Sequence, residues 1–181
     1  MKKLLLLSLI SLTLIGCASM VVPTNPSEFA ERVTTSDSEF DNAIQFNGYN
    51  IFDMKRMSLM AGYDYQNYFL RGWKDKVNGS IRHQLYVSIK YANVFDSGSW
   101  RFYRSASYSN GEQSDITEIS TDVSCYNGCD YTETIGISLS DEFLRDNMDT
   151  GFSIRFNAKS GDKNVITISP DYIKGYLQVA K

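Results

Sequence analysis

The length, composition and charge of the chain limit the classes of protein to which it can belong. It has 181 residues, of which 43% are hydrophobic and 22% charged, as expected of one globular domain with at most a short appendage. This composition excludes a collagen-like repeat, a disordered acidic tail and a multi-span membrane protein. The net charge of −3, from 18 basic and 21 acidic side chains, lacks the basic excess of nucleic-acid binders, so we expect no nucleic-acid partner.

The N-terminal residues have the pattern of an export signal. Lys2 and Lys3 give a positive start, and residues 4–15 are apolar apart from two serines and one threonine. This apolar run is shorter than the roughly 20 residues that a membrane-spanning helix needs. We therefore predict a signal peptide over residues 1–16.

The residues Leu14-Ile15-Gly16-Cys17 that follow resemble the lipobox of bacterial lipoproteins. The resemblance implies that the chain is cut before Cys17, whose thiol carries a diacylglycerol and whose new amino group receives a palmitate-like chain. Three chains anchor stably, because each buried methylene contributes about 0.8 kcal/mol. Ala18 in place of Asp implies the outer membrane, with the domain facing the periplasm. The alternative is an ordinary secretory signal with an incidental cysteine.

The mature chain divides into a linker and one domain. Residues 17–38 are predicted to be the lipidated N-terminus and a flexible tether, because prolines and small polar residues dominate there. Within it, Asn25 and Pro26 can begin a short helix that ends near Val33. Residues 39–181 are predicted to be a single periplasmic domain. Without the signal peptide the chain has 16 basic and 21 acidic side chains, a net charge of −5.

From about residue 43, hydrophobicity alternates with a period of two, as in half-buried strands. The clearest strand is 81–91, with His83 on its apolar face and Tyr86 on its polar face. Further strands are predicted at 49–52, 57–63, 65–73, 100–108, 118–125, 131–139, 152–156 and 164–168. The turn dipeptides Asn78-Gly79 and Asn110-Gly111 favour antiparallel hairpins. The fold class is therefore mainly β, an antiparallel sandwich-like sheet with one or two short packing helices.

Two helices are predicted in the C-terminal third. Ser140 or Asp141 can cap a helix over 142–148, and Ser169 followed by Pro170 can begin a C-terminal helix. The sequences around these caps and the strand between them resemble the C-terminal part of small uncharacterised proteobacterial outer-membrane lipoproteins. This resemblance covers about a quarter of the chain and implies a fold rather than an activity.

Cys125 and Cys129 enclose a three-residue turn that ends in Gly128. A glycine in the left-handed conformation would place the two cysteines opposite each other, at the 4.4–6.8 Å between Cα atoms that a disulfide needs. In an oxidising compartment we expect a structural disulfide. A redox site lacks the two-residue spacing of reactive pairs. The chain has too few Cys and His ligands for a zinc site, and we expect neither a metal nor a cofactor.

No catalytic constellation is found in the sequence. His83 is the only histidine, and on an apolar strand face it is predicted to be a hydrogen-bonded core or rim residue. A hydrolase would need a nucleophile and a carboxylate beside it, and no motif supplies them. The second half also contains many carboxylates, predicted to lie on solvated strand faces and turns: Asp115, Glu118, Asp122, Asp130, Glu133, Asp141 and Glu142.

The aromatic residues carry the most suggestive signal, with 12 Tyr, 10 Phe and two Trp in the chain. Aromatic and arginine side chains together are common at sugar and protein interfaces. Aromatic residues are, however, also frequent in ordinary strands and cores. The candidate binding surface consists of seven residues: Tyr65, Tyr68, Trp73, Trp100, Arg101, Tyr103 and Arg104. Ordinary packing is the alternative interpretation of these positions.

These observations predict a lipid-anchored cell-envelope protein that is not an enzyme. It would bind or help to assemble another envelope component, either a protein or a glycan such as peptidoglycan. Two alternatives remain: a small envelope hydrolase that uses His83 or a carboxylate pair, and a structural surface lipoprotein without a dedicated ligand. The sequence gives no signal for the oligomeric state.

Overall fold

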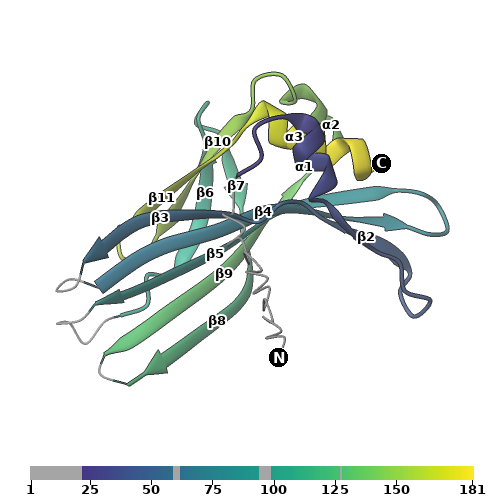
Figure 1. The fold of residues 1–181 in the computed structure, drawn as a ribbon. Coiled ribbons are helices and arrows are strands. Elements are labelled where there is room, and N and C mark those ends of the chain that lie inside the picture. The colour runs from purple at the N-terminus through teal and green to yellow at the C-terminus, as the bar shows by residue number, and fades with distance from the viewer. Residues whose placement is uncertain (1–21, 59–61, 94–98, 127) are drawn as a thin grey trace, which may run out of the picture.

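The computed structural model describes residues 22–58, 62–93, 99–126 and 128–181. These residues form eleven strands in two antiparallel sheets, and three short helices. The seven-stranded sheet runs across Figure 1, the four-stranded sheet rises from one of its faces, and the helices gather beside it on that same face. The predicted sandwich-like β fold with a C-terminal helix is therefore confirmed.

The seven-stranded sheet has the order β1-β2-β4-β5-β9-β8, and β3 also pairs with β4. Its strands are bounded as follows: β1 Thr34–Ser36, β2 Ala43–Asn47, β3 Ile51–Ser58, β4 Gly62–Asp75, β5 Ile81–Asn93, β8 Thr117–Cys125 and β9 Cys129–Leu139. The predicted strand 57–63 is instead the two sides of the β3–β4 hairpin, since Met57 lies opposite Tyr63. Leu59 and Ala61, placed on that strand, lie outside the described residues.

The four-stranded sheet has the order β11-β10-β6-β7. Its strands are β6 Tyr103–Tyr108, β7 Gln113–Asp115, β10 Phe152–Ala158 and β11 Lys163–Ile168. Of the predicted strand 100–108, only Tyr103–Tyr108 is a strand. Ser105 pairs with Asn157 and Tyr103 with Ala158, which leaves Arg104 as an extra residue. This bulge turns Tyr103 into the core, where it is 1% exposed.

The helices begin at the caps that the sequence indicated. Helix α2 (Asp141–Asp146) begins after Ser140, and α3 (Pro170–Val179) begins after Ser169. Each serine hydroxyl accepts a hydrogen bond from the backbone N–H three residues on, which satisfies one of the free donors at a helix start. No helix within the described ranges combines the length and hydropathy that crossing a bilayer requires.

The N-terminal helix corrects the predicted boundary of the tether. Helix α1 (Pro26–Glu31) begins at Asn25, as expected, but it is docked on the domain. Phe29 is 4% exposed and its ring lies 5.0 Å from that of Tyr172. A Cβ on Gly175 would lie 2.5 Å from Phe29, so this glycine permits the close approach of the two helices. The folded domain therefore includes residues 26–38, while Cys17 and the signal peptide lie outside the described residues.

The core lies between the inner faces of the two sheets and is closed by α3. Many of the most buried aliphatic residues come from the two sheets, among them Leu70, Leu85, Val87, Ile89, Ile137, Ile154, Ile166 and Ile168. On β5, the residues predicted to face the core do so, including His83. Alternation within a strand was therefore a sufficient guide wherever the strand is regular.

The predicted disulfide is present between Cys125 and Cys129. Their Cα atoms are 4.1 Å apart, slightly closer than the range we expected. Gly128 has a φ of 119°, so the positive backbone angle anticipated for the last residue of the turn is found. The bond closes the β8–β9 hairpin at its tip.

Glu133 corrects the prediction that the carboxylates are solvated. It lies on the inner face of β9, is 3% exposed, and accepts hydrogen bonds from the backbone N–H groups of Arg101, Phe102 and Tyr103 and from the Tyr91 hydroxyl. Phe102 has a φ of 56°, a conformation that is unfavourable for a side chain of this size. The Glu133 carboxylate holds this turn and so fixes where β6 begins.

Replacing Glu133 with Gln tests this assignment. The amide presents an N–H group where the backbone offers only donors, so Glu133→Gln should lower the free energy of unfolding by about 3 kcal/mol. Glu39→Gln, at an exposed loop position, is the control and should change it by less than about 0.5 kcal/mol. The measurement is urea unfolding followed by tryptophan fluorescence, and equal midpoints for the two variants would contradict the assignment.

Candidate functional site

The seven-stranded sheet has one face turned away from the core, here called the outer face. No described helix or strand covers it, because the four-stranded sheet and the helices all lie on the other side (Figure 1). Odd-numbered residues of β4 and even-numbered residues of β5 point to this face, since their neighbours along each strand are the buried ones. The side chains of the outer face are therefore available to a ligand.

Aromatic rings form a row along the outer face. Phe69 and Tyr86 are cross-strand partners with ring centroids 4.8 Å apart. Farther along β4, Tyr65 lies 5.6 Å from Tyr63 and 5.1 Å from Phe52 of β3. With Trp73, these residues make up what we call the aromatic row: Phe52, Tyr63, Tyr65, Phe69, Trp73 and Tyr86. Most are half-buried by one another, so their ring faces are held in fixed positions.

Arg71 lies within the aromatic row. Its guanidinium carbon is 4.9 Å from the Trp73 ring centre and 4.6 Å from that of Tyr86. Its Nε and Nη2 groups donate to Gln84 Oε1 at 2.9 and 2.6 Å. Partial burial lowers the pKa of Arg71, opposed by Tyr86. Across the described ranges no carboxylate forms an ion pair with Arg71. The partners of its guanidinium are therefore a neutral amide and two aromatic rings.

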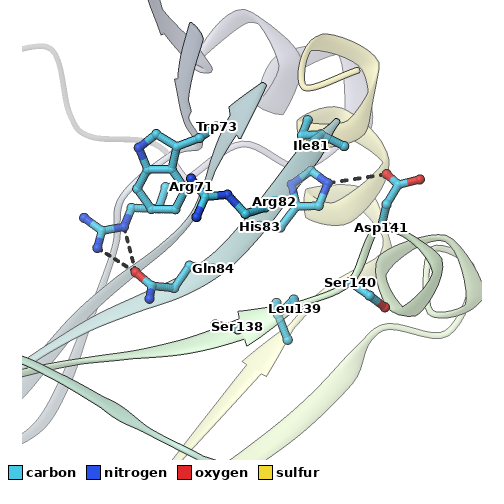
Figure 2. A pocket seen from close by; sticks show the side chains of 10 residues that line it. All are labelled: Arg71, Trp73, Ile81, Arg82, His83, Gln84, Ser138, Leu139, Ser140 and Asp141. Carbon is cyan, nitrogen blue, oxygen red and sulfur yellow. Dashed lines mark hydrogen bonds and ion pairs between the residues drawn. The ribbon is translucent and has the colours of Figure 1, made fainter. Parts of the chain in front are cut away.

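A hollow of about 500 Å³ adjoins the aromatic row at its Trp73 end. It forms where β9 ends at Leu139, opposite His83, so that Ile81 and Arg82 of β5 have no partner on that side. Figure 2 shows Arg71, Trp73 and Gln84 on one side of the hollow and the His83–Asp141 pair on the other. The remaining lining residues are Ile81, Arg82, Ser138, Leu139 and Ser140.

His83 has both ring nitrogens engaged. Nδ1 lies 2.9 Å from the Tyr176 hydroxyl and Nε2 lies 3.4 Å from Asp141 Oδ1. Burial lowers the pKa of His83, while the hydrogen bond and charge of Asp141 oppose this shift. Asp141 also accepts two hydrogen bonds from Arg145, which lower its pKa. Tyr176, whose hydroxyl lies beside Nδ1, is 0% exposed, so His83 joins β5 to α2 and α3 inside the fold and its hydroxyl partner is shielded from a substrate.

The predicted surface residues do not form one surface. Tyr65 and Trp73 belong to the aromatic row, but Tyr68 is 7% exposed and, like Tyr103, lies in the core. Trp100 packs edge-on against Tyr131, and Arg104 forms an exposed ion pair with Glu118.

Arg101 is held at the seam between the sheets. Its Nη2 donates to Asp64 at 2.7 Å, and its guanidinium lies 4.1 Å from the Tyr91 ring centre.

No group of three or more His, Cys, Asp or Glu side chains among the described residues could hold a metal ion.

Sequence reasoning missed five residues of this face: Phe52, Tyr63, Phe69, Arg71 and Tyr86. The signal was present in part, because alternation had placed Tyr86 on the polar side of its strand. Only the pairing of β4 with β5, which sets Phe69 opposite Tyr86, reveals that the rings gather. No protein-family model matches the chain, and comparisons with curated proteins and with solved structures found no significant match.

The lowered pKa of His83 predicts how stability depends on pH. Folding favours the neutral ring, so its contribution is complete above the usual histidine pKa of about 6.5 and is lost as the pH falls below that value. The free energy of unfolding should therefore decrease between pH 7 and pH 5. Asp141, whose pKa is lowered from 3.8, affects only more acidic solutions.

His83→Gln, which keeps hydrogen-bonding groups but does not titrate, should flatten this dependence. As the only histidine in the chain, His83 also gives a single imidazole resonance whose NMR titration reports its pKa directly. A midpoint at or above 6.5 in the folded protein would contradict the prediction.

Proposed function

We propose that this chain is a lipid-anchored protein of the bacterial envelope whose β domain binds another envelope component through the aromatic row. The observation that carries the proposal is the row itself, with Arg71 inside it and no described element above it. Aromatic and arginine side chains dominate the residues that contribute most to binding. An outer sheet face without a ligand is normally polar, so an uncovered row of rings favours a binding role.

The anchor is the second part of the proposal. It rests on the positive start, the apolar core and Cys17 at the end of the lipobox-like motif. The disulfide at the β8–β9 turn agrees with export, because such bonds persist in oxidising compartments. The outer membrane is the proposed location, with the domain on its periplasmic side.

The two alternatives have less support. A hydrolase that uses His83 would need an accessible nucleophile beside a ring nitrogen, and the hydroxyl that lies there, that of Tyr176, is buried. Ser140 in the same hollow uses its hydroxyl to cap α2. A structural lipoprotein without a ligand would have no use for a fixed row of rings and remains an outcome of the experiments below.

Substitution of Cys17 tests the anchor. The wild-type protein should be found in the membrane fraction and should incorporate labelled palmitate, because the acyl chains attach at this residue. Cys17→Ser should incorporate no label, and the same substitution in a chain without residues 1–16 should be found in the soluble fraction. Retention of the label by this variant would disprove lipidation at Cys17.

A pair of tyrosine variants tests the aromatic row. The soluble Cys17→Ser chain without residues 1–16 should co-sediment with isolated envelopes, and adding Tyr86→Ser should weaken that binding by about tenfold or more, as for a central interface tyrosine. Tyr126→Ser, at a turn residue that is 88% exposed, is the matched control and should bind normally. Equal binding by both variants would count against the row, and no binding by the parent chain would favour the ligand-free alternative.

A further inference from the structure

We propose that the aromatic row binds a polysaccharide that carries carboxylate groups, with sugar rings stacked on Trp73 and Tyr86 and a carboxylate bound by Arg71. This inference rests on the proposed function and names the chemistry of its ligand. It depends on three features of the same surface: a cation without an anion, a hollow beside it, and an elongated set of rings.

Arg71 is prepared to bind an anion. Two of its nitrogens are fixed by Gln84 Oε1 and its plane is held by the rings of Trp73 and Tyr86. Its third nitrogen, Nη1, donates to no residue that the structure describes. A guanidinium binds a carboxylate through parallel N–H groups, and fixing it beforehand reduces the ordering cost of binding. A bound carboxylate would supply the countercharge that Arg71 lacks among the described residues.

The hollow beside Arg71 favours a negative group. Arg82 also lines it, and no ion pair of Arg82 is found among the described residues. The one carboxylate in the lining, Asp141, is already paired with Arg145. Two guanidinium groups therefore face one neutralised carboxylate, although the chain as a whole is acidic.

The shape and polarity of the row favour a sugar polymer over a protein. From Tyr65 to Trp73 the row extends eight residues along β4, or about 26 Å at the usual rise of a strand, which is long enough for several sugar units. Amide and hydroxyl side chains such as Asn67, Gln84 and Ser88 lie between the rings. Sugar hydroxyls can bond to such groups while the C–H faces of the sugar pack on the rings. Protein hot spots instead occupy well-packed, fully desolvated pockets, whereas five of the ten residues that line this hollow are arginine, glutamine or serine.

The test is a calorimetric titration of the Cys17→Ser chain without residues 1–16 with three acidic glycans. The probes are oligogalacturonate, alginate oligomers and peptidoglycan strands freed of their stem peptides, whose muramic acid then carries a free carboxylate. At least one should bind, and its methyl-esterified form should bind about tenfold more weakly, as expected when a charged hydrogen bond is lost. Equal binding of the acid and the ester, or no binding of all three probes, would overturn the inference.

Two arginine variants make the test specific. Arg71→Gln should weaken binding by about tenfold, and Arg71→Lys, which keeps the charge but not the planar fork, should have an intermediate effect. Arg155→Gln is the matched control, because Arg155 is exposed on the four-stranded sheet and also donates to an amide oxygen, that of Asn157 at 3.0 Å. An unchanged affinity in Arg71→Gln, with wild-type thermal unfolding, would contradict the assignment.

A further arm separates this inference from the proposed function. Polyglutamate carries carboxylates without sugar rings, so binding of it as tight as that of the best glycan would overturn the glycan assignment in favour of an acidic peptide. If no acidic glycan binds but Tyr86→Ser still reduces binding to envelopes, the proposed function stands and the ligand chemistry is different. If neither effect is seen, both proposals fail.

Discussion

The hydroxyl group of Tyr172 closes a gap in the central ladder, and the arrangement of the whole domain depends on it. β4 receives β2 and β3 in succession along one edge, and between them the Leu70 N–H has no strand partner. The Tyr172 hydroxyl accepts a hydrogen bond from that N–H group at 2.9 Å and donates one to the carbonyl oxygen of Tyr49 at 2.8 Å. An unsatisfied backbone group in the core would cost 1 kcal/mol or more, so α3 is fixed at this point of the inner face.

This constraint also explains why the other face is open. With Tyr172 committed to β4, α3 lies on the inner side, and α1 follows it there through Phe29. Tyr176, one turn further along α3, reaches His83 and brings in Asp141 of α2. All three helices are thereby tied to one side of the seven-stranded sheet. The aromatic row remains uncovered as a consequence of how the core is closed, and rings positioned in this way are already ordered before any ligand arrives.

Local signals accounted for much of the fold. The caps at Ser140 and Ser169, the alternation along β5 and the turn at Gly128 depend on residues close in sequence, and the predictions made from the sequence were correct there. The segment before β6 could not be predicted, because the Arg101–Tyr103 turn is held by Glu133, about 30 residues away. The candidate surface failed for the same reason. Alternation sets Tyr65 and Tyr68 on opposite faces of their strand, but both faces of that strand carry polar and apolar residues, so only strand pairing decides which ring faces outward.

The docking of α1 also limits the distance between the domain and its proposed lipid anchor. A tether over residues 18–38 could have extended to about 75 Å, whereas the eight residues that precede Pro26 span at most about 29 Å. In the lipidated form that we propose, the domain is therefore held within a few nanometres of the bilayer surface. The aromatic row can meet only partners that come that close, and a polymer lying against the inner leaflet of the outer membrane would be within reach while one deep in the periplasm would not.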